Sequence, residues 1–191
     1  MKIKSVESTL KSAKQIIVYR NDRYGQWLGD GSSMYPINHL PTMTEKHIFA
    51  LFDIPEEKQS KYYFQERGFP KGLDFRDHIS EERMLQRGKL TLFVQGRELE
   101  PLNTSSGTVF INVKHLKPFD EEKDGFDLYE RRDENGNVYI VAKSGMLIIG
   151  IISPFNIAGK SFLKELEDLT EGVRLALSND KPMDLQQRMD E

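Results

Sequence analysis

The chain has 191 residues, no cysteine and a formal net charge of −3 at pH 7. The absence of cysteine excludes disulfides, cysteine-ligated zinc and thiolate nucleophiles. Charged residues make up 30% of the chain. Because both signs are mixed throughout, no overall basic field draws the protein onto nucleic acid or anionic lipid. The length suits one domain or two small halves.

Targeting and membrane signals point to the cytoplasm. The two lysines that follow Met1 do not lead into the apolar core of a signal peptide. The longest apolar run, residues 146–152, falls far short of the ~20 residues that a membrane-spanning helix needs. We therefore expect a cytoplasmic protein without membrane segments.

The first part of the chain predicts a helix, a β-hairpin and two more helices. Two β-rich segments flank the turn sequence Asn21–Gly25, which indicates the hairpin. Thr42 with Glu45 three residues later is a capping-box pattern at the start of the next helix. The expected elements are, in order, a helix from Ile3, strands at 15–19 and 26–35, a helix through 48–52 and a short helix at Pro55.

The middle of the chain is rich in β-formers. Asn135-Gly136 between two apolar segments is the strongest short hairpin signal in the sequence. The continuously apolar run 146–152 predicts a central strand covered on both faces. The expected elements are strands at 62–66, 90–94 and 109–113, a short helix at 80–85, and strands at 126–131, 138–142 and 146–152.

The end of the chain predicts an amphipathic helix with Ser161 as its N-cap. Its apolar face carries Phe162, Leu166, Leu169, Val173 and Ala176. Residues 120–125 are the best linker candidate, and 180–191 form a polar tail. The chain therefore predicts a single α+β domain over 1–179, with packed helices on a mixed or mostly antiparallel sheet.

An internal duplication is a further hypothesis, with halves at 1–119 and 126–179. In both halves a hairpin leads into a Pro-apolar-Asn junction, at Tyr35–Asn38 and at Ser153–Asn156, and then into an amphipathic helix. The alternative is that proline and asparagine are simply common at such junctions. The arrangement resembles the half-domain of sliding DNA clamps, which implies a replication accessory factor. The chain is short for two clamp domains, and its helices lack a basic face.

A phosphate-binding loop is suggested by Pro154–Ser161, because the segment follows an apolar strand and opens a helix. Backbone N–H groups would hold phosphate, with Lys160 as the counter-charge. Pro154 stands where the first glycine is needed and removes one N–H group. The alternatives are therefore a nucleotide-binding enzyme that uses the loop before Lys160 and a plain helix start after a strand.

Aromatic and basic residues gather around the first hairpin and form the candidate binding set. Stacking combined with phosphate contact uses this mixture of side chains. Trp27 is equally the largest apolar anchor for a core, and the acidic balance of the chain favours a core or protein contact over DNA. The candidate residues are Tyr19, Arg20, Arg23, Tyr24 and Trp27.

No complete catalytic or metal-binding pattern occurs along the chain. The four histidines are scattered without metal-ligand spacing. The sequence Asp133–Gly136 imitates half of a calcium loop but lacks the closing glutamate. The paired serines lie outside a nucleophile elbow, and the one at Ser32-Ser33 follows a turn sequence, Asp30-Gly31. We expect no catalytic residue, metal or cofactor.

Several segments together resemble uncharacterised proteins of Gram-positive bacteria and their prophages. They are Gln26–Ile37, Leu40-Pro41, Phe52–Pro55, Leu128–Arg132 and Val141–Gly145. The resemblance implies a bacterial cytosolic setting and an origin in a phage or mobile element, and it transfers no activity or site residue. The expected function is a non-catalytic intracellular binding or assembly protein whose partner is another protein or a second copy.

Overall fold

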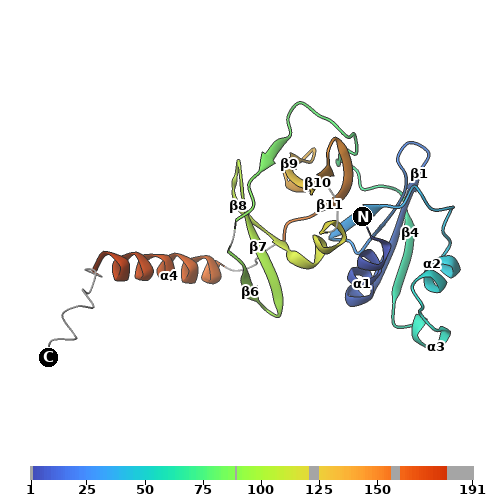
Figure 1. Ribbon diagram of the computed structural model, residues 1–191, viewed down its shortest axis with the longest axis horizontal. Helices are drawn as coiled ribbons and strands as arrows, with labels where there is room; N and C mark the ends of the chain where they lie inside the picture. The colour runs from blue at the N-terminus through green and yellow to red at the C-terminus, as the bar shows by residue number, and fades with distance from the viewer. Residues whose placement is uncertain (1, 89, 121–124, 156–159, 180–191) are drawn as a thin grey trace. The chain divides into compact units, whose positions relative to one another are not determined.

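The computed structural model describes residues 2–88, 90–120, 125–155 and 160–179. The chain divides into two compact units, residues 1–155 and 156–191. Every described strand lies in the first unit, and the described part of the second is the helix α4 (Lys160–Asn179) (Figure 1). The predicted α+β class is confirmed. None of the described helices combines the length and apolar character needed to cross a bilayer.

An eight-stranded mixed sheet dominates the first unit. Its order is β4-β1-β2-β3-β11-β10-β9-β5, and only the β1–β4 pair is parallel. Its strands are β1 (Gln15–Asn21), β2 (Gly25–Gly29), β3 (Ser33–Pro36), β4 (Tyr63–Arg67), β5 (Arg83–Leu85), β9 (Asp127–Arg132), β10 (Val138–Ser144) and β11 (Leu147–Ile152). The predicted hairpins around Asn21–Gly25 and Asn135-Gly136 are both present.

Two antiparallel meanders, β1-β2-β3 and β9-β10-β11, meet back to back in this sheet. The junction pairs β3 with β11, where Met34 lies opposite Ile151. Outward from the junction, the first meander runs β3, β2, β1 and the second runs β11, β10, β9. In both meanders the strand at the junction is therefore the last of the three in the chain. The sheet edges break this symmetry, because β4 runs parallel to β1 and β5 runs antiparallel to β9. The internal duplication stays a prediction.

A second sheet of three strands follows in the chain. It contains β6 (Leu92–Val94), β7 (Arg97–Thr104) and β8 (Gly107–Asn112). Gln95 and Gly96 join β6 to β7 with φ of 50° and 73°, as a tight hairpin turn with two left-handed residues requires. Two 3-10 helices, η1 (Val113–His115) and η2 (Lys117–Phe119), lead back to the large sheet.

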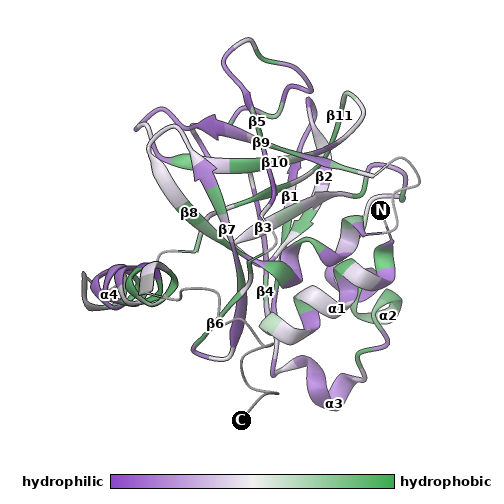
Figure 2. Cartoon of the chain, turned by 60° about the vertical axis from the view of Figure 1, so that its left-hand side comes forward, coloured by the Kyte–Doolittle hydropathy of each residue, from purple (hydrophilic) through white to green (hydrophobic). Residues whose placement is uncertain are grey.

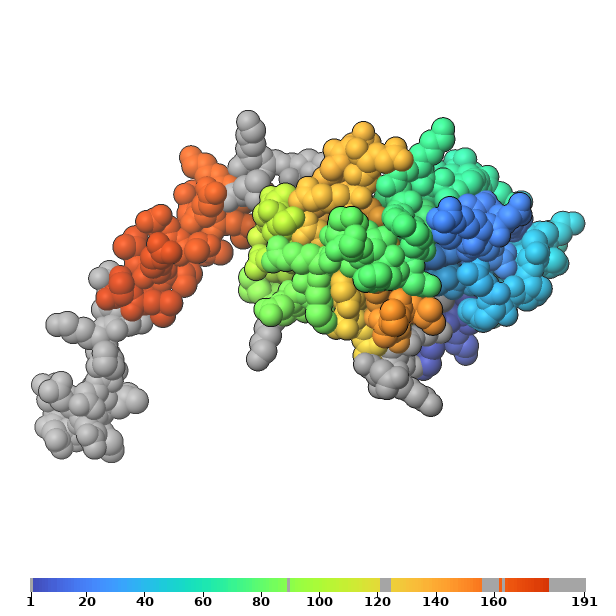
Figure 3. Space-filling view, turned by 90° about the horizontal axis from the view of Figure 1, so that it is seen from above, coloured from blue at the N-terminus to red at the C-terminus, as the bar shows by residue number. Residues whose placement is uncertain are grey.

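The large sheet is buried on both faces because its strands alternate between two cores. Ile16 and Val18 of β1 face a core shared with α1 (Ile3–Ala13) and α2 (Glu45–Leu51). Ile17 of β1 faces the other core, which the loop 68–82 covers with Phe69 and Phe75. Figure 2 shows α1, α2 and α3 (Glu56–Gln59) grouped beside the sheet, and in Figure 3 the green atoms of the loop lie beside the blue first hairpin. The central position of β11, which supplies both cores, is confirmed.

The predicted cap of α2 was wrong by two residues. The N-cap is Thr44, whose hydroxyl accepts a hydrogen bond from the backbone N–H of His47 at 3.4 Å. The ring Nδ1 of His47 accepts from the N–H of Thr44 at 3.3 Å. Histidine therefore plays the part that Glu45 was expected to play with Thr42, and a helix-capping role accounts for His47.

The predicted helix at 80–85 was also wrong. Residues 83–85 form the edge strand β5, in which Met84 lies opposite Tyr129 of β9. A free sheet edge offers backbone groups that outweigh the weak helical preference of so short a segment. Helix α4 begins at Lys160, one residue before the predicted cap Ser161.

Three predictions concern segments outside the described residues. The linker at 120–125 falls mostly on residues 121–124, and the polar tail is residues 180–191. The phosphate-binding hypothesis depends on residues 156–159, which are likewise not described. Of Pro154–Ser161 the structure describes Pro154, Phe155 and the first two residues of α4. Phe155 forms an isolated β-bridge with Phe110 within β8.

Candidate functional site

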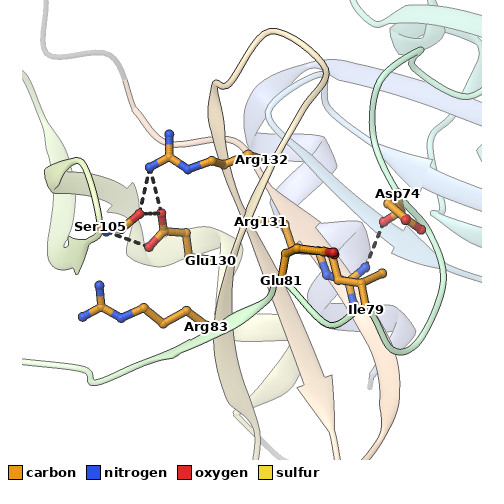
Figure 4. Close-up of a pocket in the computed structure, with 8 residues that line it drawn as sticks. All are labelled: Asp74, Ile79, Glu81, Arg83, Ser105, Glu130, Arg131 and Arg132. Atoms are coloured by element: carbon orange, nitrogen blue, oxygen red, sulfur yellow. Dashed lines mark hydrogen bonds and ion pairs between the residues drawn. The ribbon is translucent and has the colours of Figure 1, made fainter.

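A pocket of about 540 Å³ opens where the loop 68–82, the β7–β8 turn and the end of β9 come together (Figure 4). Its lining residues are Asp74, Ile79, Glu81, Arg83, Ser105, Glu130, Arg131 and Arg132. A second, more open hollow of about 570 Å³ shares Asp74 and Arg132 with the first and adds Arg23, Tyr24 and Arg76. The loop 68–82 therefore forms part of the wall of both.

Arg131 anchors this loop to the sheet. Its side chain is 0% exposed, which for an arginine requires that its N–H groups find partners. They donate to the backbone carbonyls of Asp74 at 3.0 Å and Arg76 at 2.8 Å. They also donate to the carboxylate of Glu82 at 2.5 and 2.9 Å. One buried guanidinium thus determines the course of a segment that contains no helix or strand.

Glu82 is shared by two buried cations, Arg131 and Lys143. Burial pushes the pKa of the Glu82 carboxyl upward, but the hydrogen bonds and charges of Lys143 and Arg131 outweigh burial and hold the pKa below its ordinary value. Glu82 is therefore ionised at neutral pH, and Lys143 also lies 4.7 Å from the centre of the Tyr129 ring. This network holds the loop against β9 and β10.

Ser105, Glu130 and Arg132 form the polar side of the pocket. The backbone N–H of Ser105 donates to Glu130 at 2.8 Å, and its hydroxyl donates to the same carboxylate. Arg132 donates to the Ser105 hydroxyl oxygen at 2.8 Å and to Glu130 at 3.2 Å. Burial raises the pKa of Glu130, yet the Ser105 hydrogen bonds and Arg132 together lower it overall.

These contacts give Ser105 a structural role rather than that of a nucleophile. A serine is activated by a base of matched pKa, whereas the carboxyl of Glu130 has a lowered pKa. The guanidinium of Arg132 also draws electron density from the Ser105 oxygen that would attack. No histidine lines the pocket among the described residues. The three side chains join the β7–β8 turn to β9.

Arg83 is the one lining arginine that has no hydrogen-bond or ion-pair partner among the described residues. It projects from β5, and Figure 4 shows Arg83 and Arg132 on either side of Glu130. Because the lining carries as many acids as arginines, the pocket does not present a strong field to a polyanion.

The five residues predicted as a binding set do not share one surface. Tyr19 and Trp27 are buried in the core that the loop 68–82 covers. Arg20 pairs with Glu66 at 3.2 Å and donates to the Met43 carbonyl at 2.6 Å. The alternation of β1 sends Tyr19 and Arg20 to opposite faces of the sheet.

Of that set, Arg23 and Tyr24 line the more open of the two hollows described above. The guanidinium carbon of Arg23 lies 5.2 Å from the centre of the Tyr24 ring. The same ring packs against the rings of Phe69 and Phe75. Trp27 donates its indole N–H to the Tyr24 carbonyl at 3.1 Å. The aromatic residues of the hairpin thus act mainly in packing.

Sequence reasoning missed the residues of the first pocket. Its one available signal was Arg131 at the end of the predicted strand 126–131, followed directly by Arg132. Arg131 is buried, which is unusual for an arginine. Ser105 and Glu130 are 25 residues apart, and Arg83 belonged to a segment predicted as helix. Nothing in their spacing indicated that they meet.

A second buried charge cluster lies between the β2–β3 turn and η1. The carboxylate of Asp30 accepts from Ser33 N–H at 2.8 Å and Ser32 N–H at 3.0 Å, which confirms the predicted turn. Its other oxygen lies 3.2 Å from Nε2 of His115 and 3.5 Å from the Lys114 ammonium. Nδ1 of His115 is buried without a partner among the described residues.

The pair Asp30–His115 lacks a nucleophile. The nearby Ser33 hydroxyl donates to Asp30 at 3.0 Å and not to the histidine, and the hydroxyl of Tyr35 donates to the His115 carbonyl. No group of histidine and acidic residues among those described is placed to hold a metal ion. The cluster therefore fastens the turn to η1.

The remaining candidate surface is the apolar side of α4. Four large apolar side chains of α4 are half exposed or more: Leu169 at 62%, Val173 at 50%, Leu175 at 56% and Leu177 at 70%. Leu169 and Val173 belong to the predicted apolar face, and Leu175 and Leu177 lie outside it. Phe162 and Leu166 are half-buried. A helix of this composition ordinarily buries such a face.

Comparisons of the chain with protein families, curated proteins and solved structures found no match. Functional inference therefore depends on the two surfaces just described, the polar pocket and the apolar side of α4.

Proposed function

We propose that the protein is a non-catalytic binding protein that associates with its partner through the apolar side of α4. The observation that supports this most strongly is the exposure of Leu169, Val173 and Leu177 on a single 20-residue helix. Fully burying a leucine-sized side chain stabilises by about 1.5–3 kcal/mol. In proteins most of the stability of a helix comes from packing of its amphipathic face rather than from helix propensity.

The pocket chemistry supports the non-catalytic part of the proposal. Ser105 is held between Glu130 and Arg132 in a geometry that lowers its reactivity. The buried Glu82 network positions a loop and exposes no reactive group to the pocket. The bacterial cytoplasm is the expected setting, on the strength of the resemblance to proteins of Gram-positive bacteria and their prophages.

The cysteine-free chain allows a direct test by thiol labelling. A Leu169→Cys variant places a thiol on the apolar side of α4, and Glu171→Cys places one on the polar side as a control. In cells that express the full chain at its natural level, we expect alkylation of residue 169 to be about tenfold slower than alkylation of residue 171, because only the first is covered in the assembled state. Equal alkylation rates at both positions would contradict the proposed function.

A further inference from the structure

Five apolar residues of α4 follow a heptad spacing, and Leu175 and Leu177 lie outside it. Phe162, Leu166, Leu169, Val173 and Ala176 are separated by four, three, four and three residues. A period of 3.5 residues is that of the seam of a left-handed coiled coil. The spacing indicates that another helix covers this face.

The charged residues of α4 lie in register with the same heptads. With Leu169 at position d and Val173 at position a, the outward positions b, c and f hold most of the charge. They carry Lys164, Glu167, Asp168, Glu171 and Arg174. The described e and g positions beside the seam are Glu165, Thr170, Gly172 and Leu177, and only Glu165 is charged.

This distribution favours a partner with the same sequence. Charges at e and g decide which helices pair and in which orientation. In a parallel pair of identical helices Glu165 faces Thr170 of the other copy, so like charges do not meet across the seam. A partner selected by charge complementarity would instead require several charged e and g positions, and Glu165 is the one that the described part of α4 offers.

We propose that a second copy of this chain covers the apolar side of α4, so that the protein self-associates through a coiled coil of α4 helices. This inference rests on the proposed function and names its partner. The helix spans 20 residues, fewer than three heptads, so association is concentration-dependent.

Light scattering on the full chain measures this association. The expected mass of the assembly exceeds the 22.1 kDa of one chain and increases with protein concentration across the micromolar range. A mass of 22.1 kDa at every concentration would overturn the inference.

Two matched variants distinguish association through the seam from nonspecific hydrophobic association. Leu169→Lys and Leu175→Lys remove equally exposed leucines, and each lysine follows a glutamate by four residues, namely Glu165 and Glu171. This Glu-to-Lys spacing stabilises an isolated helix, and circular dichroism should find the helix retained in both. Only residue 169 is on the seam, so we expect L169K to be monomeric and L175K to associate as the wild type does. Equal behaviour of the two variants would also overturn the inference.

The labelling experiment distinguishes failure here from failure of the proposed function. If the purified chain is monomeric and its thiol at residue 169 reacts as fast as that at residue 171, while the thiol at residue 169 is protected in cells, a different protein covers α4. The coiled coil of identical chains is then wrong, and the proposed function stands. A monomeric chain with an unprotected thiol at residue 169 would contradict both.

Discussion

Replacement of Glu82 by glutamine is expected to lower the free energy of unfolding by about 3–5 kcal/mol, because it leaves two buried cations without their counter-charge. Arg131 and Lys143 are 0% and 4% exposed, and both donate to Glu82. Urea denaturation of the full chain measures the change. The adjacent Glu81→Gln, on an exposed side chain, is the matched control and should leave stability unchanged.

The pH dependence of this effect follows from the lowered pKa of Glu82. A carboxyl whose pKa is lower in the folded state stabilises the fold at pH above its unfolded value, about 4.3. That stability is lost as the pH falls through the folded pKa. The difference between wild type and E82Q should therefore be constant near neutral pH and shrink in acid. A difference that does not shrink in acid would show that Glu82 does not act through its charge.

Replacement of Asp30 by asparagine is expected to lower the free energy of unfolding by about 3 kcal/mol. The asparagine keeps one acceptor for the N–H groups of the turn, but it removes the charge that faces His115 at 3.2 Å and Lys114 at 3.5 Å. Burial raises the pKa of Asp30, while the hydrogen bond and charge of His115, the Ser32 N–H and the charge of Lys114 lower the pKa well below its usual range. Asp22→Asn, in the exposed turn after β1, is the control.

The acid profile of D30N is the discriminating measurement. Because the folded pKa of Asp30 is lowered, its contribution is present above about pH 3.9 and is lost only as the pH falls through the folded pKa. Thermal unfolding at a series of pH values should find the wild type more stable than D30N from neutral pH down to about pH 4. Equal unfolding temperatures at pH 7 would mean that the cluster does not fasten the turn to η1.

Both networks illustrate why the pocket could not be assembled from the sequence. Glu82, Arg131 and Lys143 come from a loop and two strands that are brought together only when β9 and β10 pair and β5 completes the sheet edge. Their spacing along the chain, up to 61 residues, bears no relation to their distance in space. Charged side chains in a strand are ordinarily expected at the surface, and Arg131 is buried because three backbone carbonyls and a carboxylate satisfy it.

Local patterns were more informative where one element carries its own signal. The turns at Asn21–Gly25 and Asn135-Gly136 were predicted from residue types that tolerate tight backbone geometry, and both are present. Local signals failed where neighbouring structure decided the outcome. Residues 83–85 became a strand because β9 offered them an edge, and the hairpin aromatics Tyr19 and Trp27 turned inward because the loop 68–82 covers them.

The sequence by itself determined the α+β class, the central place of the apolar strand β11 and the heptad spacing of α4, because each depends on a period that repeats within one segment. Only the tertiary structure decided which charges are buried, which aromatic residues pack and which side chains line the pocket. Those outcomes depend on contacts between segments far apart in the chain. The free energy of burying a charge depends on partners that only the folded sheet brings near.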